Sequence, residues 1–140
     1  MDELIRILHE GCLSLVVGKG RSIHTFSGRG VSDLCRLLKN DPELLRHAMV
    51  ADKAVGKAAA GLLICGQVEA VYADIISSPA LAMLQQYGIQ ASYGQLVHHI
   101  KNRAGDDWCP MERACFDLAS PEEIRKKVMP LTGLMSPGIQ

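Results

Sequence analysis

The chain has 140 residues, with 15 basic and 15 acidic side chains, and 48% of its residues are hydrophobic. A chain of this length can bury ~68–70% of the surface that its unfolded form exposes, so its core needs no disulfide or structural metal. The zero formal net charge argues against sequence-independent nucleic-acid binding, which depends on clustered positive charge. We expect one domain over residues 1–130 and a frayed tail over residues 131–140.

The cysteines and the apolar runs indicate the cellular compartment of the protein. The five cysteines are odd in number, form no CxxC pair and follow no secretory signal, which predicts free thiols in a reducing cytoplasm. No apolar run approaches the ~20 residues that a membrane-spanning helix needs. We therefore expect a cytoplasmic protein without a membrane segment.

Apolar spacing, glycines and prolines predict helices and strands that alternate along the chain. In chain order, we expect a helix at 2–9, a hairpin of strands 12–17 and 21–26, helices at 31–39 and 42–45, a strand at 49–51, a helix at 53–64 capped by Asp52, a strand at 68–76, a helix at 78–87, a strand at 89–93, a helical turn at 96–100, a loop at 104–108, a helix starting at Pro110, and a helix at 121–128 capped by Ser120. This order predicts a three-layer α/β/α domain with a mixed sheet, because the leading hairpin is antiparallel and the later strands are linked by helical crossovers.

The segment 49–61 carries the most informative pattern. Ligands of open α/β sheets bind beyond the carboxyl ends of strands, where helix N-termini present unpaired N–H groups. Lys53 and Lys57 would share one face of the expected helix, where the macrodipole opposes each by ~0.3–1 kcal/mol. A bound anion would remove the conflict, so Asp52, Lys53, Gly56 and Lys57 are candidate ligand-binding residues. The alternative is that both lysines extend into solvent and that Asp52 serves only as a cap.

Two further segments could carry chemistry. Ser27-Gly28-Arg29-Gly30 could cradle an anion, with Arg29 as a planar donor, although a mobile strand-to-helix loop is the favoured interpretation of these residues. Cys109 would be the N-cap of the helix that Pro110 begins, and Glu112 would be its capping-box acid. A cysteine at that position can be nucleophilic, so Cys109 and Glu112 are candidate catalytic residues, unless Cys109 only stabilises the turn.

A set of short motifs is spread over most of the chain, at residues 50–60 (VADKAVGKAAA), 71–77 (VYADIIS), 79–81 (PAL), 87–89 (YGI), 102–103 (NR) and 109–112 (CPME). In these motifs the chain resembles a small prokaryotic family of unknown function with a cytidine-deaminase-like fold. The resemblance implies a leading helix, a hairpin and then alternating helices and strands.

Zinc deaminases of that superfamily carry a His or Cys beside a catalytic Glu after the hairpin, and Pro-Cys-x-x-Cys after the next strand. This chain has residues 30–33 (GVSD) and 53–57 (KAVGK) in those places. Zinc-dependent deamination is therefore not expected, and we expect no metal and no cofactor.

Three functions remain open from the sequence. The first is a metal-free site for a small anionic ligand, such as a nucleotide or a related metabolite. The second is a thiol enzyme or sulfur carrier in which Cys109 is the nucleophile, assisted by Glu112 or a histidine. The third is a non-catalytic dimerisation or interaction module. A homo-oligomer is compatible with all three, whereas no feature indicates a membrane or nucleic-acid partner.

Overall fold

The computed structural model describes residues 1–102 and 104–131. Its helices are α1 (Asp2–Glu10), α2 (Ser32–Asn40), α3 (Pro42–Leu45), α4 (Lys57–Cys65), α5 (Ser78–Gln86), α6 (Pro110–Cys115) and α7 (Pro121–Leu131). Its strands are β1 (Leu15–Lys19), β2 (Ser22–Phe26), β3 (Met49–Val55), β4 (Ala70–Ser77) and β5 (Gln90–Val97). The chain is thus an α/β protein.

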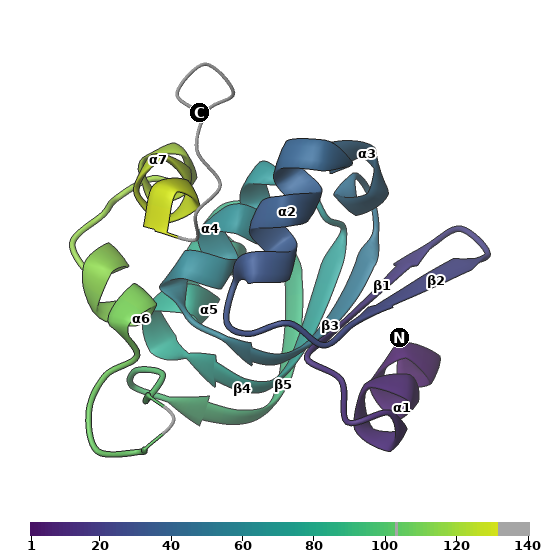
Figure 1. Cartoon of the computed structure of the whole chain (residues 1–140), viewed down its shortest axis with the longest axis horizontal. Helices are drawn as coiled ribbons and strands as arrows, with labels where there is room; N and C mark the ends of the chain where they lie inside the picture. The colour runs from purple at the N-terminus through teal and green to yellow at the C-terminus, as the bar shows by residue number, and fades with distance from the viewer. Residues whose placement is uncertain (103, 132–140) are drawn as a thin grey trace.

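The five strands form one mixed sheet in the order β2-β1-β3-β4-β5 (Figure 1). β1 is antiparallel to both β2 and β3, whereas β3, β4 and β5 are parallel to one another. The helices α4 and α5 link the parallel strands, because successive parallel strands need a crossover connection, usually a helix. The carboxyl ends of β3, β4 and β5 consequently lie at the same edge of the sheet.

Helices cover the two faces of the sheet unequally. The larger apolar core lies between the sheet and α2, α4, α5 and α7, and it includes the fully buried Val50, Leu62 and Ile124. A smaller cluster around Leu8 and Val16 fixes α1 to the opposite face, over β1 and β3. Figure 1 shows α1 apart from the other helices. The face of β4 and β5 on this side therefore remains largely open.

Most predicted elements are confirmed. The leading helix, the hairpin, the helix that breaks at Asn40 and the helix begun by Ser78 all form within a few residues of their expected bounds. Gly20 turns the hairpin with a φ of +59°, a conformation that costs glycine little. Ser120 accepts a hydrogen bond from the Glu123 N–H at 3.2 Å and donates one to its carboxylate at 3.1 Å, which makes it the capping residue of α7.

The predicted boundary between β3 and α4 is wrong. The strand continues to Val55, so Asp52 and Lys53 lie in β3, and α4 begins only at Lys57 with Gly56 as its N-cap. Pairing with β4 explains the difference, because Ala54 and Val55 align with Ile75 and Ile76 in the parallel ladder. Asp52 is thus not a helix cap, and Lys53 and Lys57 do not share a helical face.

The predicted helical turn at residues 96–100 is also wrong. β5 runs on to Val97, which aligns with Ser77 of β4, so the neighbouring strand extends the ladder beyond the stretch that local pattern indicated. The frayed tail expected over residues 131–140 lies outside the described residues except for Leu131. Leu131 ends α7, whereas residues 132–140, like Arg103, lie outside the described residues.

Candidate functional site

Three hollows meet at the carboxyl end of β3, around Ala54. The Arg29 hollow has a volume of about 300 Å³ and is bounded by the residues that follow β2 and by Asp52 and Lys53. The His98 hollow, of about 650 Å³, lies along residues 95–102. The Cys109 hollow, of about 90 Å³, lies between the starts of α2, α4 and α6. Ala54 lines all three hollows, so one edge of the sheet gathers the candidate residues other than Lys57.

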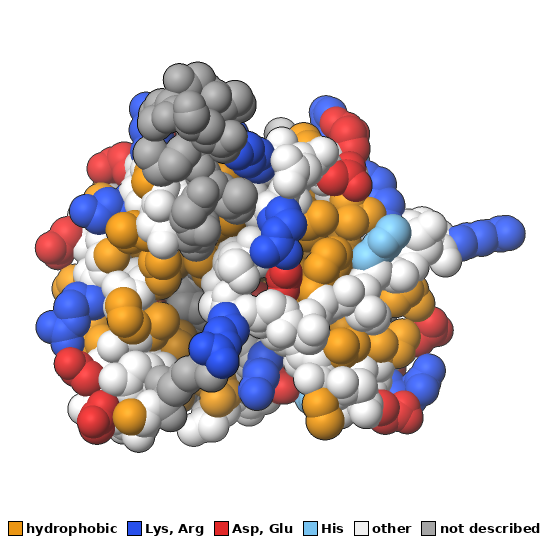
Figure 2. Space-filling model, viewed as in Figure 1, with side chains coloured by type: hydrophobic (Ala, Val, Ile, Leu, Met, Phe, Trp, Pro, Cys, Tyr) orange, Lys and Arg blue, Asp and Glu red, His pale blue; other side chains and the backbone are white. Residues whose placement is uncertain are grey.

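Arg29 and Lys53 provide the positive charge of the Arg29 hollow. Arg29 comes from the loop between β2 and α2, and Lys53 from β3; both side chains are exposed. Figure 2 shows basic side chains near the middle of this face, beside the loop that leads into α2. The loop is held by Asp33, whose carboxylate accepts a hydrogen bond from the Gly28 N–H at 2.8 Å. Two cations from separate segments thus line one concave surface.

Asp52 is the buried acid of the same hollow. Only 9% of the residue is exposed, and its carboxylate accepts a hydrogen bond from the Ala54 N–H at 3.3 Å. Burial raises the pKa of Asp52 to about 7, and the carboxylates of Asp74 and Asp33 add to the rise, whereas backbone hydrogen bonds from Ala54 and Lys53 oppose it. Asp52 can therefore be protonated near neutral pH and can donate a hydrogen bond to a bound molecule.

The N-terminus of α4 is already occupied by a carboxylate of the chain itself. Glu112 is 2% exposed, and its Oε1 accepts hydrogen bonds from the Lys57 N–H at 2.8 Å and from Ser77 Oγ at 3.4 Å. Its Oε2 accepts one from the Ile100 N–H at 2.7 Å. A Cβ on Gly56 would lie 2.9 Å from Oε2, so glycine at the N-cap leaves room for this carboxylate. The anion that the pattern of 53–57 indicated is thus supplied by Glu112.

Lys57 does not lie where the sequence predicted. Its Nζ donates a hydrogen bond to the Phe116 carbonyl at 2.8 Å, so its amine ties α4 to the end of α6. The expectation that Lys53 and Lys57 line one pocket is wrong. Lys53 lines the Arg29 hollow, whereas Lys57 is not among its lining residues. The reason is the later start of α4, which separates the lysines into a strand and a helix.

Cys109 is the N-cap residue of α6, as expected, but it makes no side-chain capping bond. Its N–H donates to the Ile100 carbonyl at 2.8 Å, and Glu112 turns toward α4 instead of completing a capping box. Cys109 is half-buried and lines the Cys109 hollow together with Gly30, Gly56 and Glu112. The two candidate catalytic residues therefore lie in one hollow, with both Glu112 oxygens already engaged.

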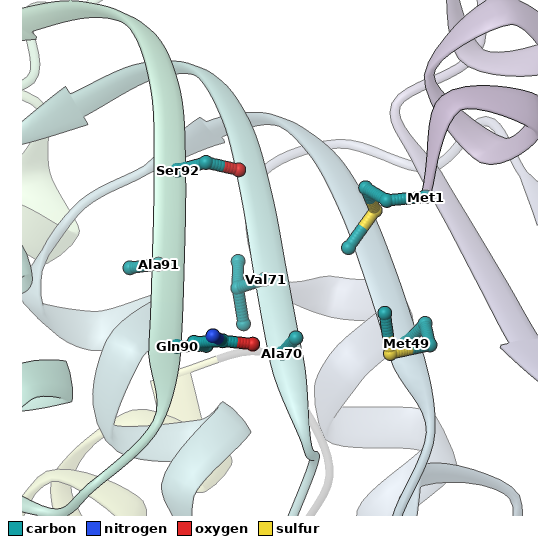
Figure 3. Close-up of a pocket in the computed structure, with 7 residues that line it drawn as sticks. All are labelled: Met1, Met49, Ala70, Val71, Gln90, Ala91 and Ser92. Carbon is teal, nitrogen blue, oxygen red and sulfur yellow. The ribbon is translucent and has the colours of Figure 1, made fainter.

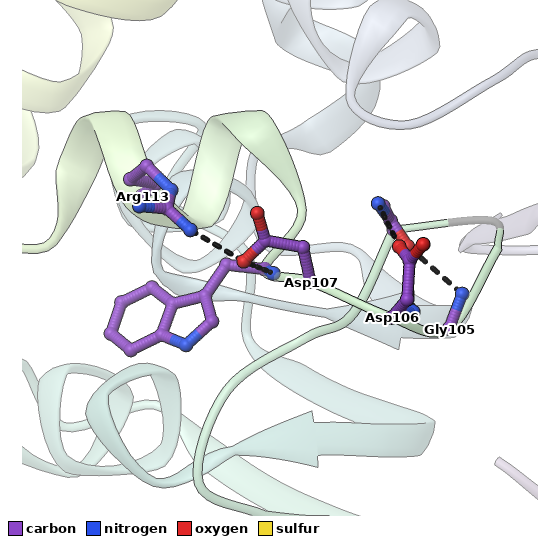
Figure 4. Close-up of polar contacts among 6 residues, drawn as sticks. Gly105, Asp106, Asp107 and Arg113 are labelled. Atoms are coloured by element: carbon purple, nitrogen blue, oxygen red, sulfur yellow. Dashed lines mark hydrogen bonds and ion pairs between the residues drawn. The ribbon is translucent and has the colours of Figure 1, made fainter.

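The loop before α6 is held by contacts among its own residues and with α6 and His99. Asn102 accepts a hydrogen bond from the Gly105 N–H at 2.9 Å and donates one to Asp106 at 3.0 Å. Arg113 Nη2 lies 2.5 Å from Asp107 Oδ1, and Figure 4 shows the two side chains facing each other. The Trp108 ring stacks on His99, with centroids 4.4 Å apart, so the loop also forms a wall beside the His98 hollow.

The sequence indicated a histidine as a possible base but did not group the residues that line the His98 hollow. His98, His99, Lys101 and Asn102 lie here beside the apolar Ile75 and Leu96. The polar run after a strand is a usable signal, but the helical turn expected at 96–100 would point the side chains of His98 and His99 in different directions. Their common location follows from the extension of β5 to Val97.

A further hollow, of about 300 Å³, lies on the other face at the amino ends of β3, β4 and β5 (Figure 3). Met1 and Met49 project into it, and Gln90 and Ser92 of β5 close it on the opposite side. Its lining has no charged side chain.

In residues 1–102 and 104–131, no group of three or more His, Cys, Asp or Glu side chains is arranged to hold a metal ion. Within the same described ranges, the helices are too short or too polar to cross a bilayer.

The fold and site define the protein as an α/β domain with a mixed sheet and hollows at the carboxyl edge of its parallel strands. The chain belongs to the family of domains of unknown function DUF1893 (TM1506), whose model matches residues 3–130. It is similar to a crystal structure of a DUF1893 family protein (TM1506) from Thermotoga maritima, with 31% identity, a TM-score of 0.83, and coverage of 94% of this chain and 91% of that one. No curated protein matches the chain.

Proposed function

We propose that this protein binds a small anionic metabolite, a nucleotide or a related compound, in the Arg29 hollow. The observation that carries the proposal is the pair of exposed cations, Arg29 and Lys53, that line one hollow beside the buried Asp52. The hollow lies at the carboxyl ends of β2 and β3, and open α/β sheets bind their ligands at such ends. Arg29 can offer two parallel N–H donors to a phosphate or carboxylate, and Lys53 adds a point charge.

We further infer that this protein is a metal-free member of the group of proteins with a cytidine-deaminase-like fold. The leading helix, the hairpin and the alternation that follows support this inference. So does the Cys109 hollow, which lies between the starts of α2 and α4, the two segments that carry zinc ligands in the deaminases that the chain resembles. Here those segments contribute Gly30, Val31 and Gly56, none of which can bind zinc through a side chain.

The free cysteines support a cytoplasmic location. None of the five cysteines forms a disulfide, and Cys12 and Cys109 are at least partly accessible. Free accessible thiols are typical of reducing compartments.

The ligand proposal predicts that neutralising Arg29 or Lys53 weakens binding. Thermal-shift screening against nucleotides and phosphorylated metabolites would first identify a ligand, because saturation at a hundredfold over Kd adds ~2.7 kcal/mol of stability. In titration calorimetry we then expect Arg29→Met and Lys53→Met each to lose ~1.5–3 kcal/mol of binding free energy, the range for a hydrogen bond to a charged group.

The matched control is Arg21→Met, which removes an exposed arginine from the β1–β2 turn, away from the hollow. All three variants should keep the circular dichroism spectrum of the parent. Undiminished affinity in the Arg29→Met, Lys53→Met double variant would reject the Arg29 hollow as the binding site.

A second candidate, a thiol enzyme or sulfur carrier, is favoured by one observation: Cys109 opens into the hollow between the starts of α2 and α4. Pulse alkylation with mass spectrometry across pH 5 to 10 tests it. Under this candidate we expect Cys109 to label faster than the exposed Cys12 at pH 7, because a nucleophilic thiol must be ionised more readily than an ordinary one.

Cys65 and Cys115 are internal slow references for that experiment. Burial is the main cause that raises the pKa of each to about 11, so both should remain largely unlabelled near neutral pH. Labelling of Cys109 at or below the rate of Cys12 would remove the thiol candidate.

A further inference from the structure

The three hollows at the carboxyl edge of the sheet adjoin one another. The Arg29 hollow shares Gly30 and Ala54 with the Cys109 hollow, which in turn shares Ala54 and Ile100 with the His98 hollow. A molecule bound at Arg29 can therefore extend past Ala54 into the His98 hollow. The volume of that hollow, about 650 Å³, is within the ~300–1,000 Å³ that small-molecule pockets usually have.

The two ends of this continuous groove differ in chemistry. Arg29 and Lys53 line one end, beside the buried Asp52. Ile75 and Leu96 line the other end, where they are 37% and 45% exposed. Ligand pockets are mostly lined by apolar side chains with a few polar groups that fix orientation, so Ile75 and Leu96 offer a surface that an apolar group can cover. The groove thus fits a molecule with an anionic end and an apolar body.

Polar side chains at the apolar end narrow the kind of body. Gln95 and His98 line the same hollow, and both are exposed. An amide offers two donors and an acceptor, and a neutral imidazole offers one of each. A nucleobase can pack its faces against the aliphatic side chains and pair its polar edge with these groups, whereas an alkyl chain would cover them without pairing them. A heteroaromatic base therefore fits this end better than an alkyl chain does.

The wall of the His98 hollow is held in place by the protein itself. His99 lines the hollow, and its ring stacks on Trp108 with centroids 4.4 Å apart. The Trp108 ring in turn meets Phe116, at the end of α6, with centroids 5.0 Å apart. The Asn102 N–H donates a hydrogen bond to the Asp107 carbonyl at 2.8 Å across the same loop. Because these groups are already ordered, covering them with a ligand costs little conformational entropy.

We propose that the ligand is a nucleoside monophosphate, with its phosphate at Arg29 and Lys53 and its base in the His98 hollow. The phosphate half rests on the function proposed above, whereas the base site is a new assignment. A phosphate monoester carries about −1.5 to −2 charges at pH 7, which the two cations can balance. The ribose would lie over Ala54, between the two hollows.

Titration calorimetry of the full chain with a panel of phosphates tests the base site. The panel consists of AMP, GMP, CMP and UMP, with ribose 5-phosphate as the ligand without a base and octyl phosphate as the ligand with an alkyl body. We expect at least one nucleotide to bind about tenfold or more tightly than both reference ligands, a difference of ~1.4 kcal/mol. The Arg29→Met, Lys53→Met double variant should bind every member of the panel more weakly.

Leu96→Ser removes part of the apolar surface of the base site. We expect it to weaken binding of the preferred nucleotide about tenfold and to leave ribose 5-phosphate unaffected. The matched control is Ile23→Ser, which changes a similarly exposed aliphatic side chain on β2, away from the groove, and should bind both ligands as the parent does. Gln95→Leu is the second variant, in case Leu96→Ser does not fold, and it should reduce the preference for the nucleotide over octyl phosphate.

The fluorescence of Trp108, the single tryptophan of the chain, reports where the base binds. A base in contact with His99 should change the Trp108 emission, because the two rings are stacked. Ribose 5-phosphate, which would reach only the Arg29 hollow and the region over Ala54, should leave the emission unchanged.

The outcomes separate this proposal from the one on which it rests. The base site is overturned if no nucleotide binds more tightly than both reference ligands, if a folded Leu96→Ser or Gln95→Leu keeps the parent's affinities, or if the preferred nucleotide leaves Trp108 emission unchanged. Each of these results is compatible with an anion site at Arg29 and Lys53. Affinities that do not fall in the Arg29→Met, Lys53→Met double variant would instead reject the Arg29 hollow, and with it both proposals.

Discussion

Replacing Glu112 by alanine is expected to destabilise the protein by ~3 kcal/mol or more. The change leaves the half-buried N–H groups of Lys57 and Ile100 and the buried Ser77 hydroxyl without their acceptor, and it removes the negative charge from the N-terminus of α4. An unsatisfied buried donor costs ~1–3 kcal/mol, and hydrogen bonds to charged groups are the stronger kind. Urea denaturation followed by circular dichroism would measure the loss.

Glu69→Ala is the matched control, because Glu69 is exposed and precedes β4 without a side-chain contact to a helix end. Its effect should stay within ~0.5 kcal/mol. Glu112→Gln should fall between the two, since an amide oxygen can accept one of the two backbone bonds. If Glu112→Ala were as stable as Glu69→Ala, the carboxylate would not be the structural anion of α4.

Asp52→Asn is expected to stabilise the protein at pH 8 and to change little below pH 4. The folded-state pKa of Asp52 is raised to about 7 from an ordinary 3.8. Between those values the folded chain holds a proton that the unfolded chain has released, so the free energy of unfolding falls as pH rises, by at most ~1.4 kcal/mol per pH unit. Above pH 7 this contribution stays constant.

Chemical denaturation at pH 4, 6 and 8 would show the effect as a difference between variant and wild type that grows with pH. We expect that difference to increase by about 2 kcal/mol or more over this range, given the roughly 1.4 kcal/mol carried by each pKa unit. The control is Asp117→Asn, at an exposed aspartate after α6. Its free energy of unfolding should change with pH in the same way as that of the wild type. If the free energy of unfolding of Asp52→Asn also followed that of the wild type with pH, Asp52 would have an ordinary pKa in the folded protein.

Asp52 also links stability to the proposed ligand. A protonated Asp52 can donate a hydrogen bond, whereas an ionised one repels an anion that Arg29 and Lys53 attract. The proposed site is therefore expected to bind anions more tightly on the acidic side of neutrality, provided that the ligand itself remains charged there.

Signals confined to a few neighbouring residues were sufficient for much of the fold. The sequence predicted the leading helix, the hairpin and the cap of α7 by Ser120, and all three are confirmed. These features depend on backbone conformation and on bonds over three or four residues, so no distant partner can alter them. The mixed sheet followed from the same local order of strands and helices.

Only the tertiary structure decided where β3 and β5 end and what meets the N-terminus of α4. Both strands extend because β4 offers a continuing ladder, which no pattern within either strand reveals. Glu112 reaches α4 across 55 residues of sequence and supplies the anion that the helix start requires. The amino-acid sequence indicated that a negative charge is needed near the start of α4, but long-range packing decides which group supplies it. Because Glu112 occupies the start of α4, the candidate site for an external anion lies instead at Arg29 and Lys53.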